Sequence, residues 1–219
     1  MHSFYDFITG PMVWISLAVF IGGSLFRIIR MIRSVAQKER FIFSYMSLKY
    51  SLRSILHWIT PFGTANMKLH PVMTAVTFVF HICLLLVPIF LLSHIVLWEE
   101  SWNLRWWALP DALADVMTVI VIGCCVFFLV RRIKLPEVRY VTSSSDYAIL
   151  AVVALPFLTG FWAYHQLPGY SFAMILHVLS GEIMLMAIPL TRLSHMIFAA
   201  FTRAYMGSEF GGVRKAIDW

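Results

Sequence analysis

Charged side chains are scarce in this chain. Aspartate, glutamate, lysine and arginine together make up 13% of its 219 residues, whereas they make up about a quarter of a typical soluble domain. Hydrophobic residues, in contrast, make up 60% of the chain. This composition excludes a soluble globular domain and indicates an integral membrane protein with room for about five membrane-spanning helices.

Cysteine is scarce as well. The three cysteines, Cys83, Cys124 and Cys125, all lie inside apolar runs. Their spacing is neither that of a zinc site nor that of a disulfide-bonded secreted domain. We therefore expect them to be small packing residues.

Five apolar runs are long enough to cross a bilayer, which predicts an all-α integral membrane protein with a bundle of five transmembrane helices. The runs cover about residues 7–26, 69–98, 112–130, 147–164 and 170–200. Pro88 lies inside the second run and predicts a kink there. We expect residues 1–201 to form one membrane domain, in which segment 34–69 lies along the membrane interface, and residues 202–219 to form a cytoplasmic tail.

The basic residues predict the orientation of the bundle. If the N-terminus is outside, every lysine and arginine except Arg105 falls in a cytoplasmic loop or in the tail, as the positive-inside rule requires. We therefore expect the N-terminus outside and the C-terminus in the cytoplasm. The net charge of +6 then reflects topology in a lipid bilayer, and we expect no nucleic acid partner.

Two histidines mark the ends of the fifth apolar run. His177 and His195 are 18 residues apart, which is about five turns of helix, so on one continuous helix both rings leave the same face about 27 Å apart. An imidazole inside a membrane span is a functional candidate by default, and the ligand that best suits such imidazoles in a helix bundle is haem iron. The alternative is that one or both rings only bond to a neighbouring helix.

The second apolar run contains candidate partners for both histidines. In the predicted topology, His94 meets His177 at the outer surface, while His81 faces inward toward His195. On a straight helix His81 and His94 point about 140° apart, but a kink at the proline between them could correct this. His70, just before the run, is a rival for the inner site.

Several motifs resemble one known family. Residues 176–181 (LHVLSG) and 189–195 (PLTRLSH) are similar to the last span of the gamma subunit of respiratory nitrate reductase, a five-helix dihaem cytochrome b in which the same spacing separates two haem ligands. Residues 80–82 resemble its ligand motif in the second span, and the loop after the third span is similar in residues 131–132, 136–139 and 146. By its size and its loop 98–111, the chain resembles still more the cytochrome b subunits of transmembrane redox complexes in sulfate reducers. These are the high-molecular-weight and tetrahaem cytochrome complexes and the sulfite-reductase-linked membrane complex.

The resemblance implies an electron-transfer subunit of a respiratory complex in a bacterial or archaeal cytoplasmic membrane. Two b haems would each be held by two histidines, from the set His81, His94, His177 and His195. Electrons would cross the membrane between quinone, with menaquinone as a candidate, or a periplasmic multihaem cytochrome c and a cytoplasmic heterodisulfide-reductase-like iron–sulfur subunit. Any enzymatic activity would be that of a quinone oxidoreductase. A haem-free membrane anchor of a redox complex is the alternative, and it predicts no b-type absorbance.

Four further residues are candidates for roles around the haems. Arg192 could offset the charge of a haem propionate, although it could equally snorkel to the inner surface. Gly181 would let the porphyrin approach the helix, although helix packing explains it as well. Glu182 lies deep in the fifth run, where a carboxyl group must be protonated, paired or in a polar cavity. It could relay protons from quinol, with Asp115 completing the exit path, or it could bond to a neighbouring helix.

Overall fold

The computed structural model describes residues 2–216, which form helices joined by turns and loops and contain no strand. Within these residues, five segments are long and apolar enough to span a membrane: Phe4–Lys38, Pro71–Phe90, Asp111–Lys134, Ser144–Tyr164 and Tyr170–Leu190. The first comprises α1 (His2–Thr9) and α2 (Pro11–Lys38), and the others are α6, α8, α10 and α11. The predicted all-α class with five spans is confirmed, and the chain is a multi-pass membrane protein.

Internal contacts divide the chain into two compact units. The terminal unit comprises Met1–Ala75 and Glu182–Trp219, and the central unit comprises Val76–Gly181. Helix α6 begins in the terminal unit and ends in the central unit, while α11 does the reverse. The expected single membrane domain over residues 1–201 stays a prediction.

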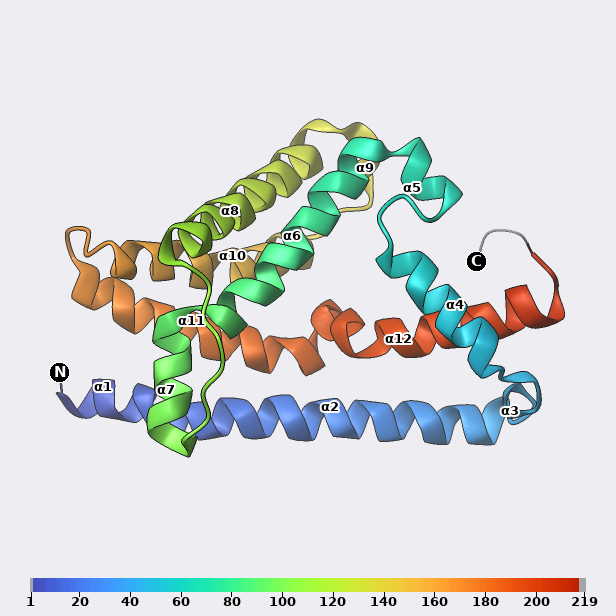
Figure 1. Cartoon of the computed structure of the whole chain (residues 1–219), viewed down its shortest axis with the longest axis horizontal. Helices are drawn as coiled ribbons and strands as arrows, with labels where there is room; N and C mark the ends of the chain where they lie inside the picture. The colour runs from blue at the N-terminus through green and yellow to red at the C-terminus, as the bar shows by residue number, and fades with distance from the viewer. Residues whose placement is uncertain (1, 217–219) are drawn as a thin grey trace. The chain divides into compact units, whose positions relative to one another are not determined.

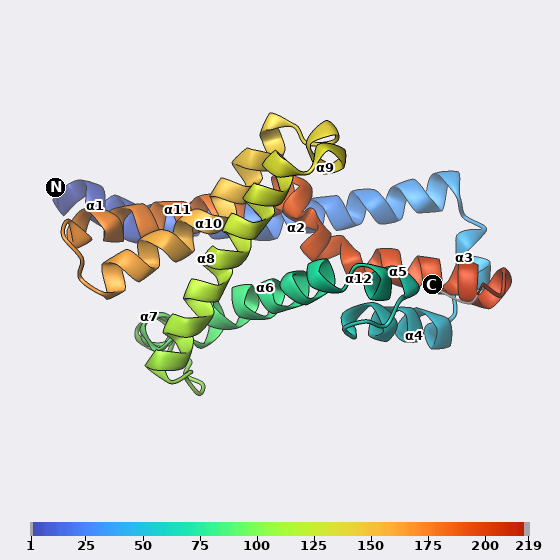
Figure 2. The ribbon, with the colours of Figure 1, turned by 90° about the horizontal axis from the view of Figure 1, so that it is seen from above.

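The central unit is built on the pair formed by α8 and α10, which pack against each other (Figure 2). Val121 of α8 and Phe157 of α10 belong to its buried core, and Phe80 of α6 meets Phe128 of α8 edge to face with ring centres 5.2 Å apart. All three cysteines are buried and unbridged, which agrees with the expected packing role.

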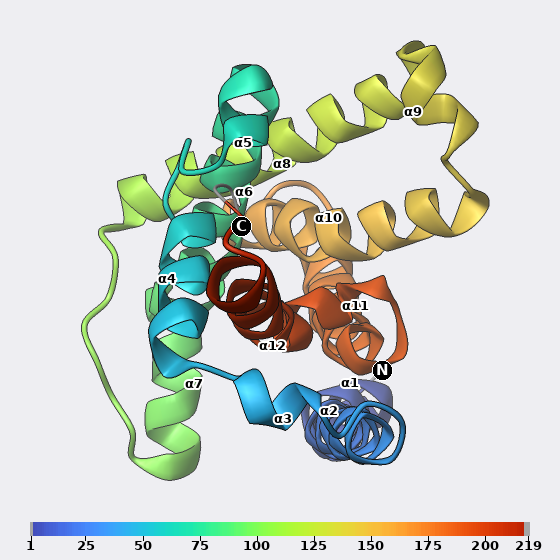
Figure 3. The ribbon, with the colours of Figure 1, turned by 90° about the vertical axis from the view of Figure 1, so that its right-hand side faces the viewer.

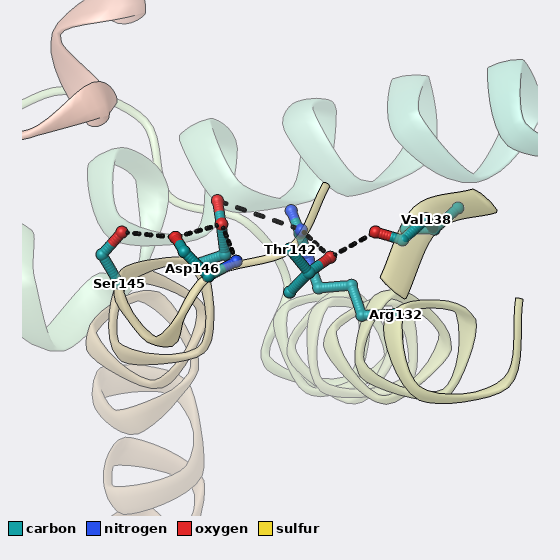
Figure 4. Close-up of polar contacts among 6 residues, drawn as sticks. Arg132, Val138, Thr142, Ser145 and Asp146 are labelled. Carbon is teal, nitrogen blue, oxygen red and sulfur yellow. Dashed lines mark hydrogen bonds and ion pairs between the residues drawn. The ribbon is translucent and has the colours of Figure 1, made fainter. Parts of the chain in front are cut away.

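Polar contacts stabilise the segment between α8 and α10, which contains the short helix α9 (Pro136–Tyr140) (Figure 4). The backbone N–H of Ser143 donates to Asp146 Oδ2 at 2.8 Å, which forms half of a capping box. Arg132 Nη1 donates to Thr142 Oγ1 at 3.3 Å and lies 3.9 Å from Asp146 Oδ1. The loop motif of residues 131–146 therefore connects two spans. In it the carboxylate of Asp146 caps α10 and pairs with the guanidinium of Arg132.

The second apolar run forms two helices, where the sequence predicts one kinked helix. Helix α6 (Pro71–Phe90) is followed by α7 (Leu92–Trp102), and Leu91 between them is extended, with φ −70° and ψ 128°. Figure 1 shows the change of direction between the two helices. Pro88 cannot donate a backbone hydrogen bond and so weakens the last turn of α6. The kink predicted at this proline is confirmed, and the backbone breaks three residues after it.

The terminal unit includes three short helices between the first and second spans: α3 (Ile42–Tyr45), α4 (Leu48–Ile59) and α5 (Ala65–Leu69). Helix α4 packs against α12 (His195–Met206) and the π-helix η2 (Gly207–Val213), as Figure 3 shows. Small side chains allow the close approach: the Ser51 hydroxyl donates to Ala204 O at 3.1 Å and lies 3.1 Å from Ser208 Oγ.

Residues 202–213, expected to belong to a tail, are helical and partly buried. Gly207 allows the close approach of this segment to α4, because a Cβ at this position would lie 2.6 Å from Ser54 Cβ. The glycine thus permits close helix packing, and the cytoplasmic tail expected over residues 202–219 stays a prediction.

The fifth apolar run also departs from expectation, because α11 (Tyr170–Leu190) ends well before residue 200. The backbone is extended at Thr191 and continues through a single 3-10 turn, Arg192–Ser194, into α12. Pro189 lacks the N–H that would continue the ladder, and its carbonyl accepts a hydrogen bond from Arg27 Nη1 at 2.8 Å. The expectation that His177 and His195 share one face of a single helix is therefore wrong.

Candidate functional site

The structure brings together two of the predicted histidines within the central unit. The rings of His94 and His177 have centres 5.9 Å apart, and their planes differ by 15°. His94 lies in the first turn of α7 and His177 in the first half of α11. The predicted pairing of these two residues thus corresponds to a spatial pair, while their role as haem ligands stays a prediction.

The helix break at Leu91 fixes the position of His94. Without the next turn of helix, the carbonyls of residues 88, 89 and 90 lose their usual N–H partners. Each finds another donor: His94 Nδ1 bonds to Pro88 O at 2.9 Å, Trp106 Nε1 to Ile89 O at 2.8 Å, and the N–H of Leu109 to Phe90 O at 2.8 Å. The loop after α7 therefore folds back over the break, and one freed carbonyl orients the imidazole.

His177 is oriented by the neighbouring helix α10. Its Nδ1 bonds to Pro156 O at 2.9 Å, and its ring lies against the backbone at Gly160, where a Cβ would come within 2.8 Å of Cε1. The buried hydroxyls of Thr159 and Ser180, 3.4 Å apart, lie beside this contact. Any larger side chain at Gly160 would displace the ring.

The four predicted ligands share one hydrogen-bond pattern. Each uses Nδ1 to bond to a backbone carbonyl: Thr77 O for His81 at 2.8 Å, Pro88 O for His94, Pro156 O for His177, and Arg192 O for His195 at 3.0 Å. A carbonyl can only accept, so Nδ1 carries the proton and Nε2 of the neutral ring has a lone pair. This is how proteins present histidines to a metal, because the second ring nitrogen is held by an acceptor.

The other described histidines differ. His57 and His165 bond through Nε2, to Gly63 O at 2.6 Å and to Asp115 Oδ1 at 3.2 Å respectively. The exposed ring of His70, the rival ligand, makes no hydrogen bond within the described residues. The bond from Nδ1 to a backbone carbonyl is thus common to the four predicted ligands.

The distance between the rings of His94 and His177 is compatible with one metal ion between them. Metal–imidazole bonds of about 2 Å put two ligand nitrogens about 4 Å apart and the ring centres about 6 Å apart, close to the 5.9 Å observed. His81 and His195 lie in different compact units, the first in α6 and the second at the start of α12.

A short repeat accompanies two of these histidines. Residues 88–94 (PIFLLSH) and 189–195 (PLTRLSH) share the pattern Pro-x-x-x-Leu-Ser-His. In both copies a helix ends just after the proline, and the histidine lies in the first turn of the next helix. The repeat is therefore visible in the sequence, but only the structure shows that each copy contains a helix break followed by a histidine.

The remaining predicted residues are placed as follows. Gly181 is the last residue of the central unit, and a Cβ there would meet no atom within 4 Å outside its own helix backbone among the described residues. Arg192 is exposed, and its backbone carbonyl bonds to His195.

Glu182 is 5% exposed, and neither carboxylate oxygen has a hydrogen-bond partner within the described residues. Asp115 Oδ1 lies 3.2 Å from His165 Nε2. Asp115 belongs to the central unit, whereas Glu182 belongs to the terminal unit.

Comparison with known proteins identifies a full-length bacterial relative. A protein of Nitratidesulfovibrio vulgaris (strain Hildenborough) is 40% identical to this chain over an alignment of 228 residues, which covers 98% of the chain and all of the relative. The chain belongs to the same family as this protein. No protein-family model matches the chain, and no solved structure does.

Proposed function

We propose that this chain is the membrane cytochrome b subunit of a respiratory complex in a bacterial cytoplasmic membrane. Two bis-histidine b haems would carry electrons across the bilayer between quinone or a periplasmic cytochrome c and a cytoplasmic iron–sulfur subunit. The observation that carries the proposal is the pair of His94 and His177, whose ring centres lie 5.9 Å apart and whose Nδ1 atoms each bond to a backbone carbonyl, which leaves Nε2 as the ligand atom.

The roles of the residues follow from their positions. His94 and His177 would hold one iron, and His81 and His195 the other. Bound haem supplies reversible one-electron chemistry, and two imidazoles on each iron leave no open position for oxygen. The carbonyls of residues 77, 88, 156 and 192 fix the tautomer of each ring, and Gly181 leaves room beside α11 for a bulky planar group.

The short repeat supports His94 as a ligand from the second apolar run. His94 and His195 end the two copies of the pattern, so the same local arrangement presents one histidine in each of the two spans. The choice between His81 and its rival His70 for the inner site stays with the test below. The relative's origin in a sulfate-reducing bacterium is also compatible with the expected partner, a heterodisulfide-reductase-like iron–sulfur subunit.

The test is a haem assay on the purified chain and four single histidine variants. Pyridine haemochrome analysis should find two b haems in the unmodified protein, and redox titration should resolve two components. H177A and H94A should each lose the same component, while H195A and H81A should each lose the other. A protein without b-type absorbance would instead favour a haem-free anchor, and loss of a haem in H70A but not in H81A would replace His81 by its rival.

A further inference from the structure

A cavity in the terminal unit lies apart from the histidines. It has a volume of about 570 Å³ and is enclosed by one face of α2, the end of α11 and the first half of α12. Its walls are mainly apolar, and two guanidinium groups project among them; the residues used below are Phe26, Arg27, Arg30, Pro189, Leu190 and Phe198. None of the described residues that line the cavity is acidic.

The two arginines of the cavity differ in their contacts. Arg27 is half-buried, donates to Pro189 O at 2.8 Å and lies 5.3 Å from the centre of the Phe198 ring. It is therefore committed to capping the C-terminal end of α11, where a cation is stabilised. Arg30, one turn further along α2, is exposed and has neither a hydrogen bond nor an ion pair within the described residues. Its five N–H donors are available to a ligand.

The position of the cavity along α2 indicates what kind of ligand can reach it. The uncharged part of the first span ends at Phe26, and Arg27 and Arg30 follow directly. The cavity thus lies where the hydrocarbon region gives way to headgroups. Phe26 and Leu190 at its apolar side are 63% and 69% exposed, which is costly in water but favourable against acyl chains.

We propose that this cavity binds an anionic phospholipid. The phosphate would be held by Arg30, with the guanidinium of Arg27 adding positive charge beside it. The acyl chains would lie along Phe26 and Leu190. A bilayer offers such amphiphilic anions at the depth of the arginines, and basic pockets between membrane helices bind lipid headgroups of this kind. Because Arg27 also bonds to Pro189, a bound lipid would tie α2 to the end of α11.

The experiment uses delipidated full-length protein in a neutral detergent. Thermal unfolding is measured while short-chain phosphatidylglycerol, phosphatidylcholine with the same chains, or inorganic phosphate is titrated in. A ligand that binds only the folded state raises the unfolding temperature in a saturable way. We expect phosphatidylglycerol to do so and the other two to have little effect.

Arg30→Gln is the discriminating variant, because Arg30 makes no hydrogen bond or ion pair within residues 2–216. It should weaken the apparent affinity for phosphatidylglycerol about tenfold, which is the size expected for one charge-assisted contact near a surface. Arg33→Gln is the matched control, because Arg33 is exposed on the next turn of α2 and does not line the cavity. Equal stabilisation by both lipids, equal stabilisation by inorganic phosphate alone, or equal losses in the two variants would each overturn the proposal.

Discussion

Gly160 offers a sharp test of how His177 is held. A Cβ at this position would lie 2.8 Å from Cε1 and 2.9 Å from Nδ1 of the imidazole, both closer than real contacts allow. In Gly160→Ala the ring must swing away and give up its hydrogen bond to Pro156 O. The lost bond costs about 0.5–1.5 kcal/mol, and the forced displacement in a packed site costs about 1–3 kcal/mol. The sum, about 1.5–4.5 kcal/mol, corresponds to a loss of about 10- to 2,000-fold in affinity for the haem proposed at His177. The lower part of this range is the about 10- to 100-fold loss typical of disturbing the partner of a metal-binding histidine.

The assay is haem content by pyridine haemochrome together with a redox titration of the purified variant. We expect Gly160→Ala to retain the component that depends on His195 and to lose, or bind weakly, the one that depends on His177. Gly123→Ala is the matched control, because it is also a glycine inside a span but a Cβ there would meet no atom within 4 Å among the described residues. Two unchanged haem components in Gly160→Ala would refute the reasoning.

Two further predictions concern the helix break and the buried acid. Trp106→Phe removes the donor to Ile89 O while keeping an aromatic ring, so it should loosen the loop over the break and shift the midpoint potential of the His94–His177 component. Trp107→Phe, which keeps its stacking on Phe90, should not, and equal shifts in both variants would count against the argument. Glu182→Gln keeps the shape of the side chain but cannot carry a proton, so quinol oxidation should fall at least tenfold with both haems retained. A normal rate would make Glu182 structural.

The sequence predicts the five spans well because hydropathy over about 20 residues depends little on tertiary contacts. The kink at Pro88 was also predictable, since a proline inside an apolar run has few other meanings. The matching break after Pro189 was not. A proline near the end of a long apolar run looks like part of the span, and the bond from Arg27 to its carbonyl joins residues far apart in the sequence.

The histidines of the candidate site could be predicted from the sequence, but the groups that orient them could not. His94 and His177 could be paired from their expected depths alone. The carbonyl of Pro156 and the space at Gly160 could not, because they come from the fourth span and depend on how α10 lies against α11. The packing of residues 207–213 on α4 could not be predicted either, because it depends on a contact between segments far apart in the sequence.

The two breaks resolve a difficulty in the spacing of the histidines. Thirteen residues separate His81 from His94, and 18 separate His177 from His195, so neither pair needs to share the face of one straight helix. In each span one histidine lies inside a membrane helix and the other in the first turn after a break. If the second and fifth spans cross the membrane in opposite directions, as the positive-inside rule predicts, each proposed iron receives one histidine of each kind. The proposed haem sites would then depend less on helix periodicity than on the Pro-x-x-x-Leu-Ser-His pattern, in which a helix ends and the histidine lies in the first turn of the next helix.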